Sequence, residues 1–337
     1  STGDAITEPI HGNITYSYGN YKIGVSKKLG GPRPATYPED FSLKTIPGEA
    51  LKISTFNVEN LYPELPEVKF KQIARIIIDS LKTPDLIGLQ EIHDNSGPKN
   101  DGTVDAKTTL QQLTDFIVRE GGPRYRFLQL NPENNADGGW PGANIRNAFL
   151  YLPTMTLGAS YRFQDPAFDE NDASEFSGTR KPLIAFFKHG EKKLIVINCH
   201  LRSKGGDSPT MGTLFPPVRF SEVQRTAQTR ALRKHVEELR QKHPDAGIVV
   251  LGDMNDFEFS PALENLTQNG GLINLVESVP LNQRYTYIFQ GFSQVLDHIL
   301  VSDNLSPAFS ATIVHVNADR SSELRASDHD PVLAWLK

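Results

Sequence analysis

Carboxylate, amide and imidazole side chains recur in this sequence where apolar, strand-like runs end. Five such segments follow one another at 53–57, 86–91, 195–200, 249–255 and 327–332, with a sixth at 295–298. Hard oxygen ligands and histidines delivered from several strand ends are what metal-assisted phosphate chemistry requires. The recurrence predicts one site assembled from distant parts of the chain.

The segment Asp253-Met254-Asn255 combines a carboxylate and an amide. On an extended chain both point to one side while Met254 points away, so together they could ligate a cation and orient a phosphate oxygen. The alternative is a turn, because Gly-Asp and Asn-Asp pairs commonly form turns. Because five other segments end in the same way, the functional interpretation of Asp253 and Asn255 is favoured over the turn.

Two aspartates and a histidine follow in the C-terminal part: Asp297 after a strand, and Asp328 directly before His329. A carboxylate that fixes one imidazole nitrogen leaves the other free to take a proton from water, which is the general-base arrangement. A turn cap and a surface histidine would explain an isolated Asp-His pair equally well. The other polar strand ends favour the general-base interpretation of this pair.

Three further strand-end residues are Asn57, Glu91 and His200. A charge closing an apolar strand, as Glu91 does, needs solvent or a partner, and a strand-end asparagine is often structural. His200 shares a strand face with Asn198, whereas Cys199 faces the other way as core filler.

Cationic residues flank the same strands, namely Arg146, Arg180, Arg202 and Lys204. If the strand ends converge on one cleft, these side chains become phosphate clamps; otherwise they are solvated edge charges. The acidic loop 94–105 does not have the spacing of an EF-hand. We interpret it as a solvated loop, with a second cation site as the alternative.

Composition places few restrictions on function. The 337 residues carry a net charge of −5, so no global basic field is available to hold nucleic acid, although a nuclease needs only a local basic rim. Cys199 is the only cysteine, which excludes an intrachain disulfide. No apolar run approaches the roughly 20 residues of a membrane span.

Periodicity predicts helices over 66–81, 108–118 and 218–239. Strands are predicted between and after them, at 125–130, 145–152, 182–188, 193–200, 247–252, 294–301, 309–316 and 331–336. Long helices among many strands favour a layered α/β sandwich. Residues 13–23 form a hairpin signal broken at Gly19-Asn20, followed by a Pro/Gly-rich tract.

From about residue 51 to 337, the order of these segments resembles the endonuclease/exonuclease/phosphatase superfamily, the DNase I-like fold of nucleases, sphingomyelinases and inositol-polyphosphate phosphatases. The resemblance implies an α/β (α+β) four-layered sandwich, with two packed mixed β-sheets flanked by helices. It also implies a domain at 49–337, preceded at 1–48 by a β extension and linker.

The resemblance assigns roles to matching positions. It makes Glu91, Asn57 and Asp328 ligands of Mg²⁺, with Mn²⁺ or Ca²⁺ as alternatives. His329 is the base, oriented by Asp297. The remaining assignments are transition-state and leaving-group contacts by His200, Asp253 and Asn255, and phosphate binding by Asn57, Arg146, Arg180, Arg202 and Lys204.

Segments 95–106, 144–151 and 200–205 are similar, more narrowly, to bacterial extracellular nucleases, in which an OB-like module precedes the catalytic domain. Residues 16–21 resemble the last strands of that module, so the extension is interpreted as its remnant. The resemblance implies a secreted, extracellular or periplasmic enzyme that hydrolyses DNA, or RNA, by metal-assisted water attack. We expect a monomer with no obligate protein partner.

Two alternatives stay open. A phosphatase or phosphodiesterase acting on a lipid or sugar phosphate would share the same catalytic blocks, and fold similarity cannot choose between them. The apolar residues of loop 209–217 are a candidate lipid contact. A catalytically inactive binding module is the third reading, disfavoured because the glutamate, Asp-x-Asn and Asp-His sites are all present.

Overall fold

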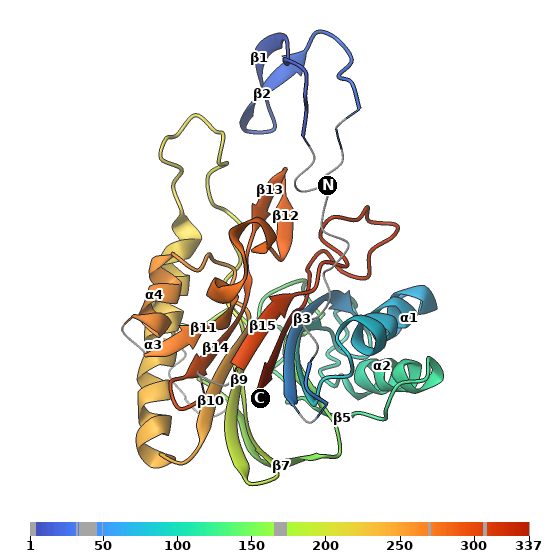
Figure 1. The fold of residues 1–337 in the computed structure, drawn as a ribbon, viewed down its shortest axis with the longest axis vertical. Coiled ribbons are helices and arrows are strands. Elements are labelled where there is room, and N and C mark those ends of the chain that lie inside the picture. The colour runs from blue at the N-terminus through green and yellow to red at the C-terminus, as the bar shows by residue number, and fades with distance from the viewer. Residues whose placement is uncertain are drawn as a thin grey trace.

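Two six-stranded β-sheets lie face to face between helices in the computed structural model (Figure 1). The structure describes residues 5–31, 33, 46–48, 50–164, 174–268, 271–305 and 309–336. The predicted four-layered sandwich of two mixed sheets is confirmed.

The first sheet and its helices form one half of the sandwich. Its strands, in spatial order, are β15 (Phe309–Ile313), β16 (Val332–Leu336), β3 (Leu51–Leu61), β4 (Leu86–Ile92), β6 (Arg146–Tyr151) and β5 (Arg126–Leu128). The outer face packs on α1 (Glu67–Arg75), which continues as the π-helical turn η1 (Ile76–Ser80), and on α2 (Lys107–Arg119). The apolar spacing that predicted these helices supplies their buried faces.

The second sheet forms the other half. Its order is β11 (Leu272–Asn274), β14 (Asp297–Ser302), β10 (Gly247–Asp253), β9 (Lys192–His200), β8 (Leu183–His189) and β7 (Met155–Arg162). Its outer face packs on α3 (Phe220–Lys242) and α4 (Pro261–Thr267). A third apolar cluster fills the space between the sheets, because alternate residues of each strand face inward.

Strand register brings the chemistry-bearing ends together. Asp253, the last residue of β10, lies opposite His200 of β9 on one side and opposite Asp297 of β14 on the other. Gly252 permits this approach: its φ is +136°, and an added Cβ would lie 1.9 Å from the Cys199 carbonyl oxygen. A side chain at position 252 would therefore push β9 and β10 apart.

Several elements differ from the sequence prediction. Strand β7 was not predicted. It lies at a sheet edge, where several of its residues are exposed or half-buried, so its sequence lacks the continuous apolar run by which the other strands were recognised. Helix α4, the short 3-10 helices η3 (Leu275–Ser278) and η4 (Leu281–Gln283), and the hairpin of β12 (Tyr287–Phe289) and β13 (Phe292–Gln294) were also not predicted. These pieces are too short to show a period.

The predicted N-terminal hairpin is present as β1 (Gly12–Ser17) and β2 (Asn20–Val25). It contacts the loop after β9, where the Tyr21 N–H donates to the Met211 carbonyl oxygen at 2.7 Å. Most of the linker prediction falls at 32, 34–45 and 49, outside the described residues, and the OB-like origin stays a prediction. None of the described helices is both long and apolar enough to cross a membrane.

Candidate active site

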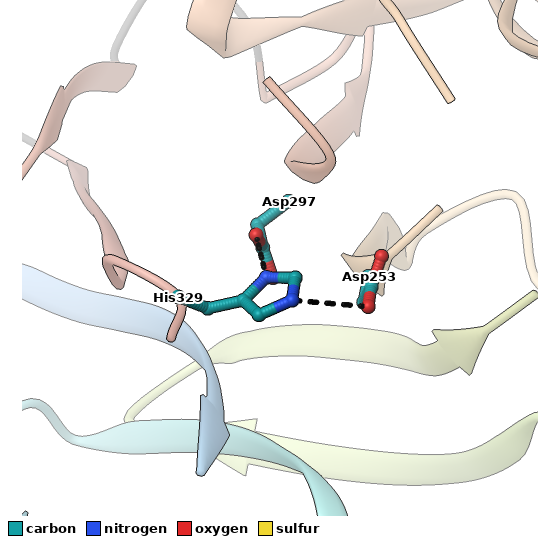
Figure 2. A group of neighbouring side chains, drawn as sticks. All are labelled: Asp253, Asp297 and His329. Atoms are coloured by element: carbon teal, nitrogen blue, oxygen red, sulfur yellow. Dashed lines mark hydrogen bonds and ion pairs between the residues drawn. The ribbon is translucent and has the colours of Figure 1, made fainter. Parts of the chain in front are cut away.

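The strand ends of the two sheets converge on one buried carboxylate, that of Asp253 (Figure 2). His200 and His329 approach its Oδ2 with their Nε2 atoms, at 3.5 and 3.8 Å. The other nitrogen of His329, Nδ1, lies 2.7 Å from Asp297 Oδ2. His329 therefore has one nitrogen held and the other directed into the site, as a general base requires.

Asn57 joins this group to Glu91. Its Nδ2 donates to Glu91 Oε1 at 3.0 Å and to Asp253 Oδ2 at 3.1 Å, linking the two sheets. The other Glu91 oxygen accepts the Asn60 N–H at 2.9 Å. Glu91 has φ of 63°, unusual for a non-glycine residue, at the bulge where β3 and β4 lose register. Glu91 and His329, 238 positions apart in the chain, thus belong to one cluster.

The segment bearing His329 is fixed from both sides. Ser327 Oγ donates to the Asn57 carbonyl oxygen at 2.6 Å and accepts the His329 N–H at 3.1 Å. Asn317 Nδ2 donates to the His329 carbonyl oxygen at 2.8 Å. Asp328, between them, is half-buried.

Thr286, just before β12, links the segment that bears His329 to Asp297. Its Oγ1 accepts the N–H groups of Leu296 and Asp297, at 3.0 and 3.2 Å. Its carbonyl oxygen accepts the Asp330 N–H at 2.7 Å. The sequence analysis did not single out Thr286, because a threonine in a loop between short elements carries no distinctive signal.

Burial dominates the electrostatics of the cluster. It raises the pKa of Glu91 and that of Asp253, with the negative charge of Asp297 adding to the effect on Asp253. Burial lowers the pKa of His200 well below its usual value, assisted by Arg180 and His329. Burial also opposes the charged form of His329, but Asp297 and Asp253 outweigh it and hold its pKa well above the usual value.

Two buried polar atoms in the cluster lack a hydrogen-bond partner among the described residues, His200 Nδ1 and Asp297 Oδ1. Asn255, with φ of 51°, donates its N–H to Asp253 Oδ1 at 2.8 Å and its Nδ2 to the Leu201 carbonyl oxygen at 3.2 Å. The predicted residues Asn57, Glu91, His200, Asp253, Asn255, Asp297 and His329 are therefore linked by direct contacts or adjacent register.

Three of the four predicted phosphate-binding cations lie beside this cluster. Arg180 is buried and donates to the Leu201 carbonyl oxygen at 2.6 Å, close enough for Glu91 and Asp253 to favour its charge. Arg202 is exposed. Lys204 Nζ lies 3.9 Å from Asp256 Oδ1 and 4.2 Å from the Phe257 ring centroid, and burial lowers its pKa to about 8.

Arg146 occupies a different place from the other cations. Its Nε and Nη2 donate to the Asn144 carbonyl oxygen, and its Nη1 donates to oxygens of Val104, Gln129 and Asn131. The guanidinium is 2% exposed and occupied by these contacts. These contacts make Arg146 part of the scaffold of the neighbouring loops. The phosphate-binding role assigned to it stays a prediction.

The acidic loop 94–105 is also internally bonded. Asp94 accepts from Ser96 and Asn144, and Asp105 accepts from Asn95 and Gln129. These hydrogen bonds order the loop and account for its polar residues.

The residues of the cluster fit a divalent cation. Among the described residues, Asp253, Asp297 and His329 form one group whose ligand atoms all lie within 4.8 Å of one another. The Glu91 carboxylate adjoins it and adds hard oxygen ligands of the kind that Mg²⁺ prefers. The Asn57 amide faces the cluster with Nδ2, while its Oδ1 accepts the Glu59 N–H at 3.1 Å. The 2.7 Å contact of His329 Nδ1 with Asp297 Oδ2 leaves little room for an ion between those two atoms.

A two-sheet sandwich with metal-capable carboxylates and an Asp-oriented histidine at its strand ends defines a phosphoesterase-type hydrolase. The chain belongs to the Endonuclease/Exonuclease/phosphatase family, whose model matches residues 54–329. Membership makes the protein a metal-dependent hydrolase of phosphoric ester bonds. No curated protein sequence matches the chain.

Solved structures share the fold at low sequence identity. An endonuclease/exonuclease/phosphatase family protein from Leptotrichia buccalis is 16% identical with TM-score 0.59, covering 86% of this chain and 100% of its own. Truncated Caenorhabditis elegans TDP2 is 18% identical with TM-score 0.56, covering 86% and 98%. D. rerio TDP2 complexed with a single-strand DNA product is 17% identical with TM-score 0.54, covering 86% and 99%.

Proposed function

We propose that the protein is a secreted, extracellular or periplasmic nuclease that hydrolyses phosphodiester bonds of DNA, or RNA. The reaction uses a divalent cation, for which Mg²⁺ is the first candidate. The observation that carries the proposal is the His329 imidazole, held at Nδ1 by Asp297 and aimed by Nε2 toward Asp253. The D. rerio neighbour with bound single-strand DNA supports nucleic acid as the substrate class.

In the proposed reaction, Glu91, Asn57 and Asp328 would hold the cation, which would supply positive charge against the negative charge that develops on the phosphate oxygens. His329 Nε2 takes the proton of the attacking water, and the imidazolium that forms is stabilised by Asp297 and Asp253. His329 must be unprotonated to act as a base. The positive charge of a cation bound at the carboxylates would lower the pKa of His329 and so favour the loss of its proton.

The opposite side of the cluster handles the leaving oxygen. Asp253, ionised while it stabilises the His329 imidazolium 3.8 Å away, can take up that proton and pass it to the departing oxygen, and the burial that raises its pKa favours the uptake. We assign Asn255, which adjoins Asp253, and neutral His200 to hydrogen bonds that stabilise the pentacovalent phosphate. Arg180, Arg202 and Lys204 bind flanking phosphates, which gives affinity but little sequence selectivity.

A lipid phosphodiesterase is the second candidate, favoured by one observation. The loop after β9 exposes Met211, Leu214 and Phe215 at 52%, 54% and 93%. Exposed apolar side chains of this kind also occur on membrane-binding loops.

The two candidates separate in one experiment. Supercoiled plasmid, linear duplex, single-stranded DNA, RNA, bis-nitrophenyl phosphate and sphingomyelin are each incubated with Mg²⁺, Mn²⁺, Ca²⁺ or EDTA. Metal-dependent cleavage of the polynucleotides, with little action on sphingomyelin, supports the nuclease. Hydrolysis of sphingomyelin without cleavage of any polynucleotide would overturn it.

A further inference from the structure

A row of aromatic rings leads from the general base out to solvent along the β12–β13 hairpin. The Tyr287 ring lies 4.8 Å from the His329 ring at 30°, and Tyr287 and His329 also form a β-bridge. Phe289 follows, 6.4 Å from Tyr287 and nearly parallel at 11°. Phe289 is 51% exposed, so the row ends at a residue that is open to solvent.

The hairpin register widens this surface. Phe292 pairs with Phe289 across the hairpin, and directly opposed residues of an antiparallel pair point to the same face. Phe292 is 39% exposed. In Figure 1 the hairpin projects beyond the strands of the sandwich. The contact of Tyr287 with His329 joins the start of the hairpin to the catalytic cluster. Nothing in the proposed chemistry uses Phe289 or Phe292.

The composition of the hairpin indicates what binds there. Residues 287–294 contain no charged side chain, so the hairpin itself offers no partner for phosphate or for an anionic membrane surface. Exposed, flat aromatic faces beside a phosphate-binding site are the usual platform for nucleobases, which stack regardless of sequence. A base stacked in a duplex has both faces covered and has no free face to offer.

We propose that Phe289, supported by Tyr287 and Phe292, is a subsite for an unpaired nucleobase of the nucleotide next to the scissile phosphate. This inference rests on the proposed nuclease function and narrows its substrate to strands with accessible bases. Tyr287 is the positioning residue in this arrangement: its ring packs against His329 and carries Phe289 at a fixed place relative to the base.

The test uses two fluorescently labelled 12-nucleotide strands, one of thymidines and one in which every sugar lacks its base. Phe289→Ala is expected to lower kcat/KM about fivefold or more on the thymidine strand and to leave the base-less strand unchanged. Phe289→Trp is expected to keep the parent value. Val68→Ala, which removes an exposed apolar side chain on α1, is the control and should change neither.

Equal effects of Phe289→Ala on both strands, or no effect on either, would overturn the subsite. So would a loss of binding to phosphatidylcholine vesicles that leaves cleavage of both strands unchanged, because the hairpin would then contact lipid. If the parent enzyme cleaves duplex DNA but neither strand, the subsite is overturned; if it cleaves no polynucleotide at all, the nuclease proposal fails. The subsite is then tested by fluorescence anisotropy in EDTA, where Phe289→Ala should weaken binding of the thymidine strand alone, and equal binding by both proteins would overturn it.

Discussion

Two buried polar clusters in this molecule differ in how completely their hydrogen bonds are matched. In the loop cluster around Asp94, Asn144 and Arg146, the guanidinium donates from Nε and both terminal nitrogens, and the carboxylate accepts on both oxygens. In the catalytic cluster, carboxylates crowd one another, and Asp297 Oδ1 and His200 Nδ1 have no partner among the described residues.

This difference in hydrogen bonding indicates that the loop cluster is structural and that the catalytic cluster is a functional site. An unpaired polar atom or crowded charge costs stability in a folded interior, so such an arrangement persists where it serves another purpose. A cation would offset the crowded negative charge of the catalytic cluster, whereas Asp94, Asn144 and Arg146 have no unpaired buried polar atom among the described residues. The predictions below are ordered from the largest expected effect to the smallest.

Removal of the base should have the largest effect. His329→Ala is expected to lower kcat on plasmid DNA by about 10²-fold or more, because proton transfer from water loses its acceptor. The unfolding temperature should change little. A variant that retains the parent rate would show that His329 is not the base.

Loss of the carboxylate at position 91 should act through the metal. Glu91→Gln is expected to raise the Mg²⁺ concentration for half-maximal activity by about 10-fold or more. Titration of activity with Mg²⁺ after dialysis against EDTA measures the shift. The same Mg²⁺ requirement in parent and variant would place the ion elsewhere.

Substitution in the loop cluster should affect stability rather than chemistry. Arg146→Ala leaves buried carbonyl oxygens without donors and is expected to lower the free energy of unfolding by about 3 kcal/mol. Urea denaturation measures this loss. The kcat/KM of the folded fraction should stay within a few-fold of the parent value. A selective rise in KM would instead show that Arg146 contacts the substrate.

The smallest effect concerns pH. Because burial lowers the pKa of Lys204 to about 8, its charge is present below that pH and is lost above it. KM for DNA should therefore rise a few-fold between pH 7 and pH 9. Lys204→Arg, which stays charged throughout, should remove that part of the dependence; an unchanged profile would exclude Lys204 from phosphate binding.

The sequence predicted the layers and most of the cluster because both depend on local patterns. Apolar runs marked the buried strands, and polar residues at their ends marked the shared edge. The register that places Asp253 between His200 and Asp297 depends on sheet order, which no local pattern contains. Arg146 and Arg180 look alike in sequence, both standing at strand starts; only the loop carbonyls around Arg146 distinguish them.

Residues acting through short elements could not be found from sequence. Thr286, Tyr287 and Ser327 hold or cover the base, but each is an ordinary residue type in a segment of a few positions. Their importance follows from what they contact, and those contacts cross the fold.

The most direct test of the account is a crystal of the protein grown with Mn²⁺ and measured for anomalous scattering. We predict a manganese peak bonded to the Glu91 carboxylate, beside Asn57 and Asp328, with the contact between His329 and Asp297 intact. A peak held by Asp297 and His329, with Glu91 uncoordinated, would contradict the division of the cluster into a metal side and a base.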